Sequence, residues 1–178
     1  MRVIGLTGKA GSGKSYLARE VLAKEGWVPL ALAGPMKAEL SSQGVIPLSE
    51  SLDLEKKTER TRRVLQVYGT ELGRERYNEN VWCNALGWWM RWFETQGSID
   101  KFVITDVRFP NEVKFVGLMG GQVIRVVGRG GLEGEAARHP SETALNNWVF
   151  PVVNNCPCLP MDAVRADLLA RISEHYGI

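Results

Sequence analysis

The chain has 178 residues and a formal net charge of +2, with 44% hydrophobic and 24% charged residues, which is typical of one globular domain. A charge this close to neutral argues against a nucleic-acid polymer as partner, and no apolar run approaches the roughly 20 residues that cross a bilayer. Because the chain starts directly in a predicted strand, we expect no signal peptide and a cytoplasmic location.

The first predicted elements are a buried strand over 2–7 and a helix over 16–24. Between them the chain fits the phosphate-binding pattern G-x-x-x-x-G-K-[ST] at each fixed position. A strand that turns into a helix N-terminus aims several backbone N–H groups and the positive end of the helix dipole at one point. The alternative is a glycine-rich turn that carries Lys and Ser by chance, but the flanking elements favour a nucleoside triphosphate site.

Each residue type in this loop has a chemical reason. The glycines permit backbone angles closed to other residues and a close approach to phosphate oxygens. Lys14 would place its ammonium on the β- and γ-phosphates, and the Ser15 hydroxyl would ligate Mg²⁺. We therefore expect ATP and Mg²⁺ to bind at Gly8, Lys9, Ala10, Gly11, Ser12, Gly13, Lys14, Ser15 and Tyr16.

The middle of the chain is predicted to be mainly helical, after a second buried strand over 27–33. We predict helices over 36–40, within 53–73 and over 78–95, with a polar loop over 41–53. The last of these helices carries apolar side chains at spacings of three and four, namely Trp82, Leu86, Trp89 and Phe93. Such a stripe is more often core than a ligand site.

Strands and helices alternate in the second half of the chain. We predict strands over 101–106, 122–127 and 149–153, and helices over 111–119, 140–145 and 161–176. Segment 128–139 has little to bury and is predicted to be a mobile loop. Alternation of this kind indicates parallel βαβ units. The predicted fold class is therefore α/β, with a five-stranded parallel sheet covered by helices on both faces.

Two charged residues follow the predicted strand 101–106, at the edge where α/β sheets bind ligands. Asp106 is placed to hold Mg²⁺ through water, as a Walker-B-like acid; otherwise it caps the next turn. Arg108 suits bidentate contact with a second phosphate group. Further arginines concentrate in the middle segment and the late loop, which favours phosphoryl transfer by charge neutralisation: Arg62, Arg63, Arg74, Arg76, Arg129 and Arg138.

The three cysteines are Cys83, Cys156 and Cys158. They form an unpromising disulfide set, and in a reducing cytoplasm we expect all three as thiols. With only two histidines and no second close cysteine pair, a structural zinc site is not expected either.

Four blocks of the chain resemble the phage-type deoxynucleoside monophosphate kinases, within the P-loop nucleoside monophosphate kinases. The blocks are residues 5–15; Leu65-Gln66-Val67-Tyr68-Gly69-Thr70-Glu71-Leu72-Gly73-Arg74 with Trp82 downstream; Thr105-Asp106-Val107-Arg108-Phe109-Pro110-Asn111-Glu112 followed by Gly120-Gly121; and Arg129 with His139-Pro140-Ser141-Glu142. The resemblance implies a three-layer P-loop fold of one domain. Its core would comprise 1–35, 96–127 and 143–178, with a nucleoside monophosphate (NMP) lobe at about 36–95 and a lid at about 128–142.

The resemblance also implies a reaction, in which ATP phosphorylates a deoxynucleoside monophosphate to the diphosphate. Arg108 and Arg74 would hold the acceptor phosphate. The residues near the acceptor nucleoside would be Gln66, Thr70 and Glu71. Arg129 and Arg138 would close over the transferring phosphate. Asn155 would lie beside the ATP adenine. The expected catalytic residues are thus Lys14, Arg108, Arg129 and Asp106, with Ser15 and Asp106 on the metal.

Two other functions stay open at this stage. One is a P-loop kinase of another small acceptor, such as dephospho-coenzyme A. The other is a nucleotide-switched binding protein with Trp88 and Trp92 as its exposed contact. The many arginines favour the kinase. The accepted base, the sugar and the oligomeric state also stay open, and the Trp-rich helix is a candidate homodimer interface.

Overall fold

The computed structural model describes residues 1–52, 58–97, 99–131, 138 and 140–177. Its two compact units are Met1–Leu30 with Gly97–Ile178, and Ala31–Gln96. Among the described helices, none combines the length and the apolar character that a membrane crossing requires.

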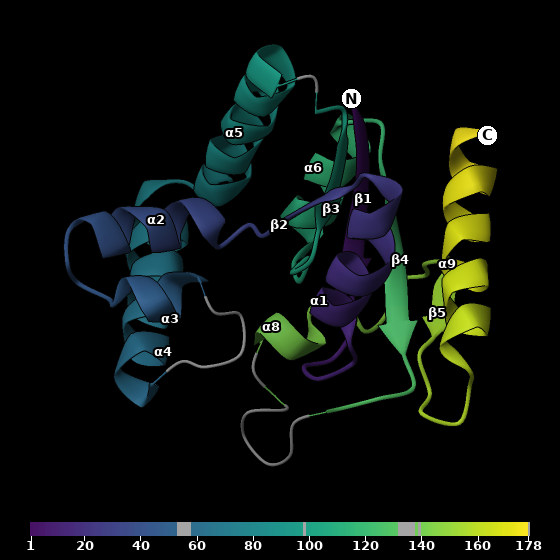
Figure 1. The fold of residues 1–178 in the computed structure, drawn as a ribbon. Helices are drawn as coiled ribbons and strands as arrows, with labels where there is room; N and C mark the ends of the chain where they lie inside the picture. The colour runs from purple at the N-terminus through teal and green to yellow at the C-terminus, as the bar shows by residue number, and fades with distance from the viewer. Residues whose placement is uncertain (53–57, 98, 132–137, 139, 178) are drawn as a thin grey trace. The chain divides into compact units, whose positions relative to one another are not determined.

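The first unit is built on a five-stranded sheet (Figure 1). Its strands are β1 (Arg2–Thr7), β2 (Val28–Leu30), β3 (Lys101–Ile104), β4 (Gln122–Val127) and β5 (Val152–Asn154). They lie in the order β2-β3-β1-β4-β5, and every neighbouring pair is parallel. Because β1 is central, the loop that follows it lies at the middle of the carboxyl edge of the sheet. The predicted five-stranded parallel α/β fold is confirmed.

Helices cover both faces of this sheet. On one face lie α1 (Lys14–Leu17), its continuation η1 (Ala18–Leu22) and η2 (Ala23–Glu25), together with α9 (Met161–Tyr176). On the other lies α6 (Pro110–Leu118). A Cβ atom on Gly5 would meet side chains of Val107, Val116 and Val123 at 3.0–3.1 Å, so glycine lets this layer approach β1 closely.

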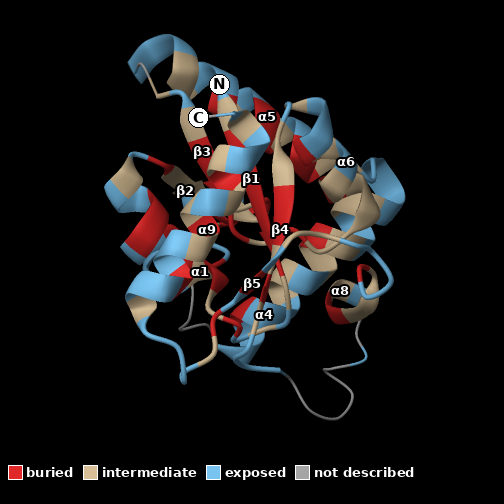
Figure 2. Ribbon diagram, turned by 90° about the vertical axis from the view of Figure 1, so that its right-hand side faces the viewer, coloured by how far each residue is buried: buried red, intermediate tan, exposed pale blue. Residues whose placement is uncertain are grey.

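The main core of the first unit lies between the sheet, α1, η1 and α9. Ile4 and Leu6 point into it from alternate positions of β1, and Val164, Leu168 and Ile172 point into it from α9. Figure 2 shows buried residues concentrated in the strands. At the far end of α9 the Tyr176 hydroxyl accepts from Val3 N (2.8 Å) and donates to Val3 O (2.9 Å), which joins the last helix to the central strand.

The second unit is helical in its described part. It contains α2 (Gly34–Ser42), α3 (Leu48–Leu52), α4 (Glu59–Gln66), the π-helix η3 (Val67–Tyr77) and α5 (Val81–Gly97). Two glycines allow η3 to pack closely. A Cβ on Gly69 would lie 2.9 Å from Met36 Sδ, and one on Gly73 would lie 2.8 Å from the Trp82 ring. Trp82 Nε1 also donates to Gly69 O (2.9 Å), so packing accounts for both glycines of the 65–74 block.

The loop predicted over 41–53 is wrong. Helix α2 extends through Ser42, and α3 occupies Leu48–Leu52. Pro47 O accepts from Glu50 N and Ser51 N at the start of α3, and Ser51 Oγ donates to Lys37 O of α2 (3.3 Å). Because this stretch is polar in composition, its sequence does not reveal the short helix α3, which contacts α2.

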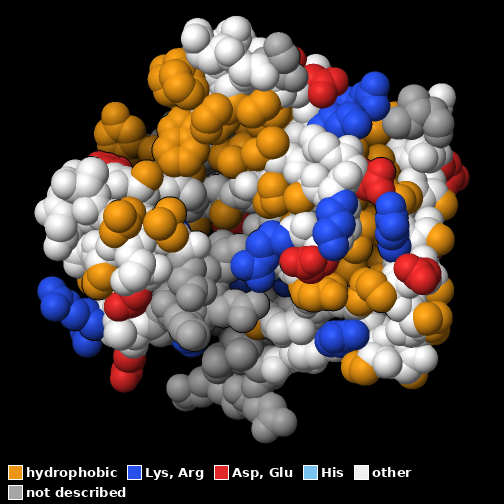
Figure 3. All heavy atoms as spheres, in the orientation of Figure 1, with side chains coloured by type: hydrophobic (Ala, Val, Ile, Leu, Met, Phe, Trp, Pro, Cys, Tyr) orange, Lys and Arg blue, Asp and Glu red, His pale blue; other side chains and the backbone are white. Residues whose placement is uncertain are grey.

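Helix α5 carries the predicted aromatic stripe. Trp82 and Leu86 are buried, and Trp89 and Phe93 are half-buried. On the adjoining side Trp88 and Trp92 are 64% and 49% exposed, and hydrophobic side chains gather on the surface over α5 in Figure 3.

Candidate active site

The loop between β1 and α1 requires glycine at two tightly packed positions. Gly13 has a φ of 91° and precedes α1, and a Cβ there would lie 2.2 Å from Asn155 Nδ2. Gly8 has a φ of 133°, and a Cβ there would lie 2.2 Å from Val126 O. The loop is therefore held between the ends of β4 and β5, and its backbone conformation is closed to other residues.

We expect Gly13→Ala to damage this loop. The new methyl group would push Asn155 away and would strain the backbone, so the free energy of unfolding should fall by about 1–3 kcal/mol. ATP affinity should fall by about tenfold or more, because the amide cradle would distort. Chemical denaturation and ATP titration measure the two effects. Gly117→Ala is the matched control, since a Cβ there meets nothing within 4 Å; equal behaviour of the two variants would contradict the prediction.

Lys14 is buried, with its side chain folded over the loop. Its Nζ donates to Gly8 O (2.7 Å), Lys9 O (2.8 Å) and Ser12 Oγ (3.3 Å). The pKa of Lys14 lies at about 8, below its ordinary 10.5, chiefly because the ammonium is buried and also because the Arg108 guanidinium is near; the Glu142 and Asp106 carboxylates partly offset this lowering. A poorly solvated ammonium beside a helix N-terminus is a strong binding group for a polyphosphate.

Arg108 follows β3 and is held from two directions. Its backbone N donates to Glu112 Oε2 (2.6 Å), as does Phe109 N (3.0 Å), so the buried Glu112 fixes the turn into α6. Its Nη1 donates to the Glu142 carboxylate and to Ser141 O (3.3 Å). Glu142 lies in α8 (Pro140–Thr143). The guanidinium is thus positioned at the carboxyl edge of the sheet.

Asn155 connects three parts of the site. Its Nδ2 donates to Ser12 O (3.0 Å), its backbone N donates to Val127 O (2.7 Å), and its backbone O accepts from Arg129 Nε (2.7 Å). Its side-chain Oδ1 is buried and has no hydrogen-bond partner within the described chain. Asn155 therefore couples the phosphate-binding loop to Arg129, and it leaves one acceptor for a ligand or water.

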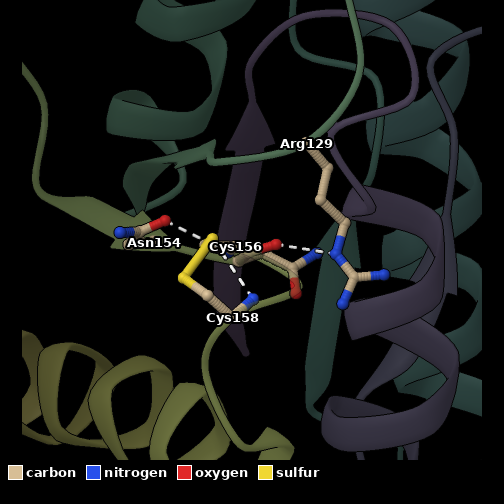
Figure 4. The surroundings of a disulfide bond; sticks show 5 residues. Arg129, Asn154, Cys156 and Cys158 are labelled. Carbon is tan, nitrogen blue, oxygen red and sulfur yellow. Dashed lines mark hydrogen bonds between the residues drawn. A yellow bond between two sulfur atoms is a disulfide. The ribbon is translucent and has the colours of Figure 1, made fainter.

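A disulfide joins Cys156 and Cys158, directly after Asn155 (Figure 4). The prediction that these two residues are thiols is therefore wrong, while Cys83 is buried and takes no part in this disulfide. Asn154 Oδ1 accepts from Cys156 N (3.1 Å), and the turn brings the two cysteine Cα atoms to 5.2 Å, a separation that permits the bond. The two-residue spacing in the sequence does not reveal this turn.

The predicted metal ligands are hard oxygen donors at the same edge. Ser15 is half-buried in α1, and Asp106 is half-buried after β3, close enough to Lys14 to raise its pKa. No cluster of three or more acidic, His or Cys side chains suited to a metal occurs in the described ranges. This donor set fits Mg²⁺, which keeps several waters and binds through few side chains and substrate phosphates.

A cavity of about 520 Å³ lies beside these groups. Four cationic side chains line the described part of this cavity, namely Lys9, Arg108, Arg125 and Arg129. The one carboxylate in this described lining is Glu142. Sequence reasoning missed Arg125, whose guanidinium lies 5.1 Å from the centre of the Phe150 ring and donates to Leu145 O. It also gave no role to Glu112 or Glu142. Such a cavity can hold a compact polyanion.

The remaining predicted residues lie elsewhere. Gln66, Thr70 and Arg74 recur every four residues along α4 and η3 of the second unit, and Thr70 and Arg74 are half-buried while Gln66 and Glu71 are exposed. Tyr16, in α1, is exposed, and Arg138, in the late segment of the chain, is exposed as well. Residues 132–137 and 139 of the predicted lid lie outside the described residues, and with them lies most of the mobile loop predicted over 128–139.

Comparison with known proteins gives a consistent result. The family model for deoxynucleotide monophosphate kinases matches residues 48–148, more than half of the chain. A putative deoxynucleotide monophosphate kinase of Acanthamoeba polyphaga mimivirus is 27% identical over 174 residues, which is 87% of this chain and 89% of that protein.

Solved structures share the fold. TT1252 from Thermus thermophilus has a TM-score of 0.56 and 20% identity, covering 97% of this chain and 96% of its own. A dephospho-CoA kinase from Campylobacter jejuni has a TM-score of 0.53 and 16% identity, covering 98% and 97%. At these identities the likeness concerns the fold alone.

Proposed function

Because this chain belongs to the deoxynucleotide monophosphate kinase family, we propose that it transfers the γ-phosphoryl group of ATP to a deoxynucleoside 5′-monophosphate. Family membership makes it a nucleotide kinase; the acceptor is the proposed part. The observation that carries the proposal is the convergence of Lys14 and Arg108 at one end of the sheet, beside a cation-lined cavity. Two anionic substrates meeting head to head require such an arrangement.

The donor half of the site is assigned to the loop after β1. Residues Gly8 to Tyr16 would bind ATP, with Lys14 on the β- and γ-phosphates. Asn155 would lie at the adenine end, where its unpaired Oδ1 suits an amino group. Ser15, and Asp106 through water, would hold Mg²⁺, which when bound neutralises charge on the phosphates.

The acceptor half is assigned to arginines and to the second unit. Arg108 and Arg74 would hold the acceptor phosphate. Ala31–Gln96 fold as a compact unit, which supports an NMP lobe at about 36–95; its nucleoside contacts would be Gln66, Thr70 and Glu71. Arg129 and Arg138 flank segment 132–137 and would close over the transferring group as parts of a lid at about 128–142.

The chemistry needs little from the protein beyond placement and charge. An acceptor phosphate oxygen is already anionic near neutral pH, so it attacks the γ-phosphorus without a general base. A bond forms between this oxygen and phosphorus, the bond from phosphorus to the β,γ-bridging oxygen breaks, and ADP leaves with the electron pair. Lys14, Arg108 and Arg129 would stabilise the charge spread over the transferring group, and closure would exclude water.

The test is an acceptor panel. Purified protein with Mg-ATP is offered deoxynucleoside monophosphates, ribonucleoside monophosphates and dephospho-coenzyme A, and formation of the phosphorylated acceptor is measured. We expect turnover with one or more deoxynucleoside monophosphates, and loss of turnover when EDTA removes the metal. Turnover with dephospho-coenzyme A alone would favour the other small-acceptor kinase. Slow ATP hydrolysis that no acceptor accelerates would favour a nucleotide-switched binding protein.

A further inference from the structure

Glu142 is a buried carboxylate to which the proposed function gives no role. We propose that Glu142 is a resident anion: without nucleotide, its carboxylate occupies the position of the phosphoryl group to be transferred, and substrate phosphate displaces it. This inference rests on the proposed function, because it takes the loop after β1 as the donor site and Arg108 as the acceptor ligand.

The contacts of Glu142 place it between the two half-sites. Its Oε2 accepts from Ala10 N of the phosphate-binding loop (2.9 Å), and its Oε1 accepts from Arg108 Nη1. The side chain is 4% exposed. A phosphoryl group in transit must likewise contact both the loop amides and the acceptor arginine. One carboxylate therefore bridges the same two kinds of donor.

The charge of Glu142 suits this position. The Arg108 guanidinium is close enough to Lys14 to lower the pKa of the Lys14 ammonium, and the Glu142 carboxylate acts to raise that pKa. Among the described residues that line the cavity, Glu142 is the only acid. Burial by itself would raise the pKa of Glu142, but the Ala10 amide and the Arg108 charge outweigh it and hold that pKa below its ordinary value. The group is thus an anion that pairs with Arg108 and offsets the charge of Lys14.

The helix that carries Glu142 is held by the same polar groups. Within the four residues of α8 only Glu142 is buried. Lys9 Nζ donates to Glu142 O (2.5 Å) and to Asn146 Oδ1 (3.0 Å), and Arg108 donates to Ser141 O. Phosphate that captures Lys9 or Arg108 would therefore remove bonds that keep α8 in place.

This assignment predicts the sign of a mutational effect. A carboxylate that competes with phosphate weakens phosphate binding, so its removal should strengthen binding; a carboxylate that only supports the loop should do the reverse. Glu142→Gln keeps the shape and one acceptor for Ala10 N but removes the charge. Hydrogen bonds to charged groups are strong enough for an effect of about tenfold.

The experiment is calorimetric titration with pyrophosphate, which needs no acceptor. We expect Glu142→Gln to bind pyrophosphate about tenfold more tightly than the unsubstituted protein. Glu25→Gln is the matched control, since Glu25 pairs with Arg165 at the surface and its loss changes the net charge equally. Binding by Glu142→Gln that is unchanged, weaker or absent would overturn the proposal, as would an equal gain in both variants.

A second measurement uses the unsubstituted protein, so it does not depend on the variant folding. Carbodiimide coupling with an amine labels exposed carboxylates, and mass spectrometry reads the peptide that contains Glu142. We expect pyrophosphate to increase labelling of Glu142 by several-fold; unchanged or reduced labelling contradicts displacement. A failed acceptor panel with both pyrophosphate results intact would overturn the proposed function alone.

Discussion

Replacing Arg108 by alanine should lower phosphoryl transfer by a factor of about 10² to 10³, the usual effect of removing one electrostatic stabiliser. In this site Arg108 lies at the carboxyl edge of β3. Its backbone N donates to the Glu112 carboxylate, and its Nη1 donates to the Glu142 carboxylate. Alanine removes the charge without disturbing the Glu112 hydrogen bond, which involves only the backbone. Steady-state kinetics should show a lower kcat and a higher KM for the monophosphate, with a smaller change in KM for ATP.

Two further variants decide what this result means. Arg108→Lys keeps the charge but not the planar fork, so we expect it to restore only a small part of the activity. Arg165→Ala removes an exposed arginine that pairs with Glu25, and it should leave kcat and both KM values unchanged. Near-normal transfer by Arg108→Ala would show that Arg108 does not hold a reacting phosphate.

The sequence was most informative where a local pattern carries the structure. The short apolar run within 2–7 and the glycines that follow it predicted β1 and its loop, because backbone conformation there depends on adjacent residues. The helix predicted over 161–176 is likewise confirmed as α9, in which Val164, Leu168 and Ile172 are buried at spacings of four. In these elements the hydrophobic period and the final packing agree.

Contacts between distant residues could not be predicted in this way. Glu142 reaches Ala10 across 132 positions, and Asn155 reaches Ser12 across 143. Nothing near Glu142 in the chain distinguishes a buried acid from a solvated one. The same reason explains the missed helix α3, in which the Ser51 hydroxyl donates to Lys37 O of α2, and the missed disulfide, which depends on a turn after β5. Polar side chains at the site acquire their roles from partners that the chain brings together only on folding.

The glycines of the 65–74 block show how a resemblance and a physical reason can differ. The resemblance places this block near the acceptor nucleoside. The structure shows that Gly69 and Gly73 serve packing against Met36 and Trp82. The neighbouring Thr70 and Arg74 are polar and half-buried, so their proposed contacts with the acceptor depend on side chains that the packing of the glycines leaves unexplained.

Replacing Lys14 by methionine should abolish most phosphoryl transfer, by a factor of about 10² to 10³, without unfolding the protein. The low pKa of Lys14, about 8, means that the folded protein disfavours the charged ammonium, chiefly because the ammonium is buried. Methionine fills a similar volume without this cost, so we expect the free energy of unfolding at neutral pH to stay constant or to rise by about 1–2 kcal/mol. Pyrophosphate affinity should fall by at least tenfold in the same variant.

Lys24→Met is the control, since Lys24 is exposed and pairs with Glu20 four residues earlier. This variant should leave phosphoryl transfer, the free energy of unfolding and pyrophosphate affinity unchanged. A Lys14→Met protein that is stable and inactive would show that this buried charge is maintained for the substrate at the expense of the fold. A variant that unfolds, or one that still transfers phosphate at the normal rate, would mean that Lys14 supports the loop and does not bind the donor.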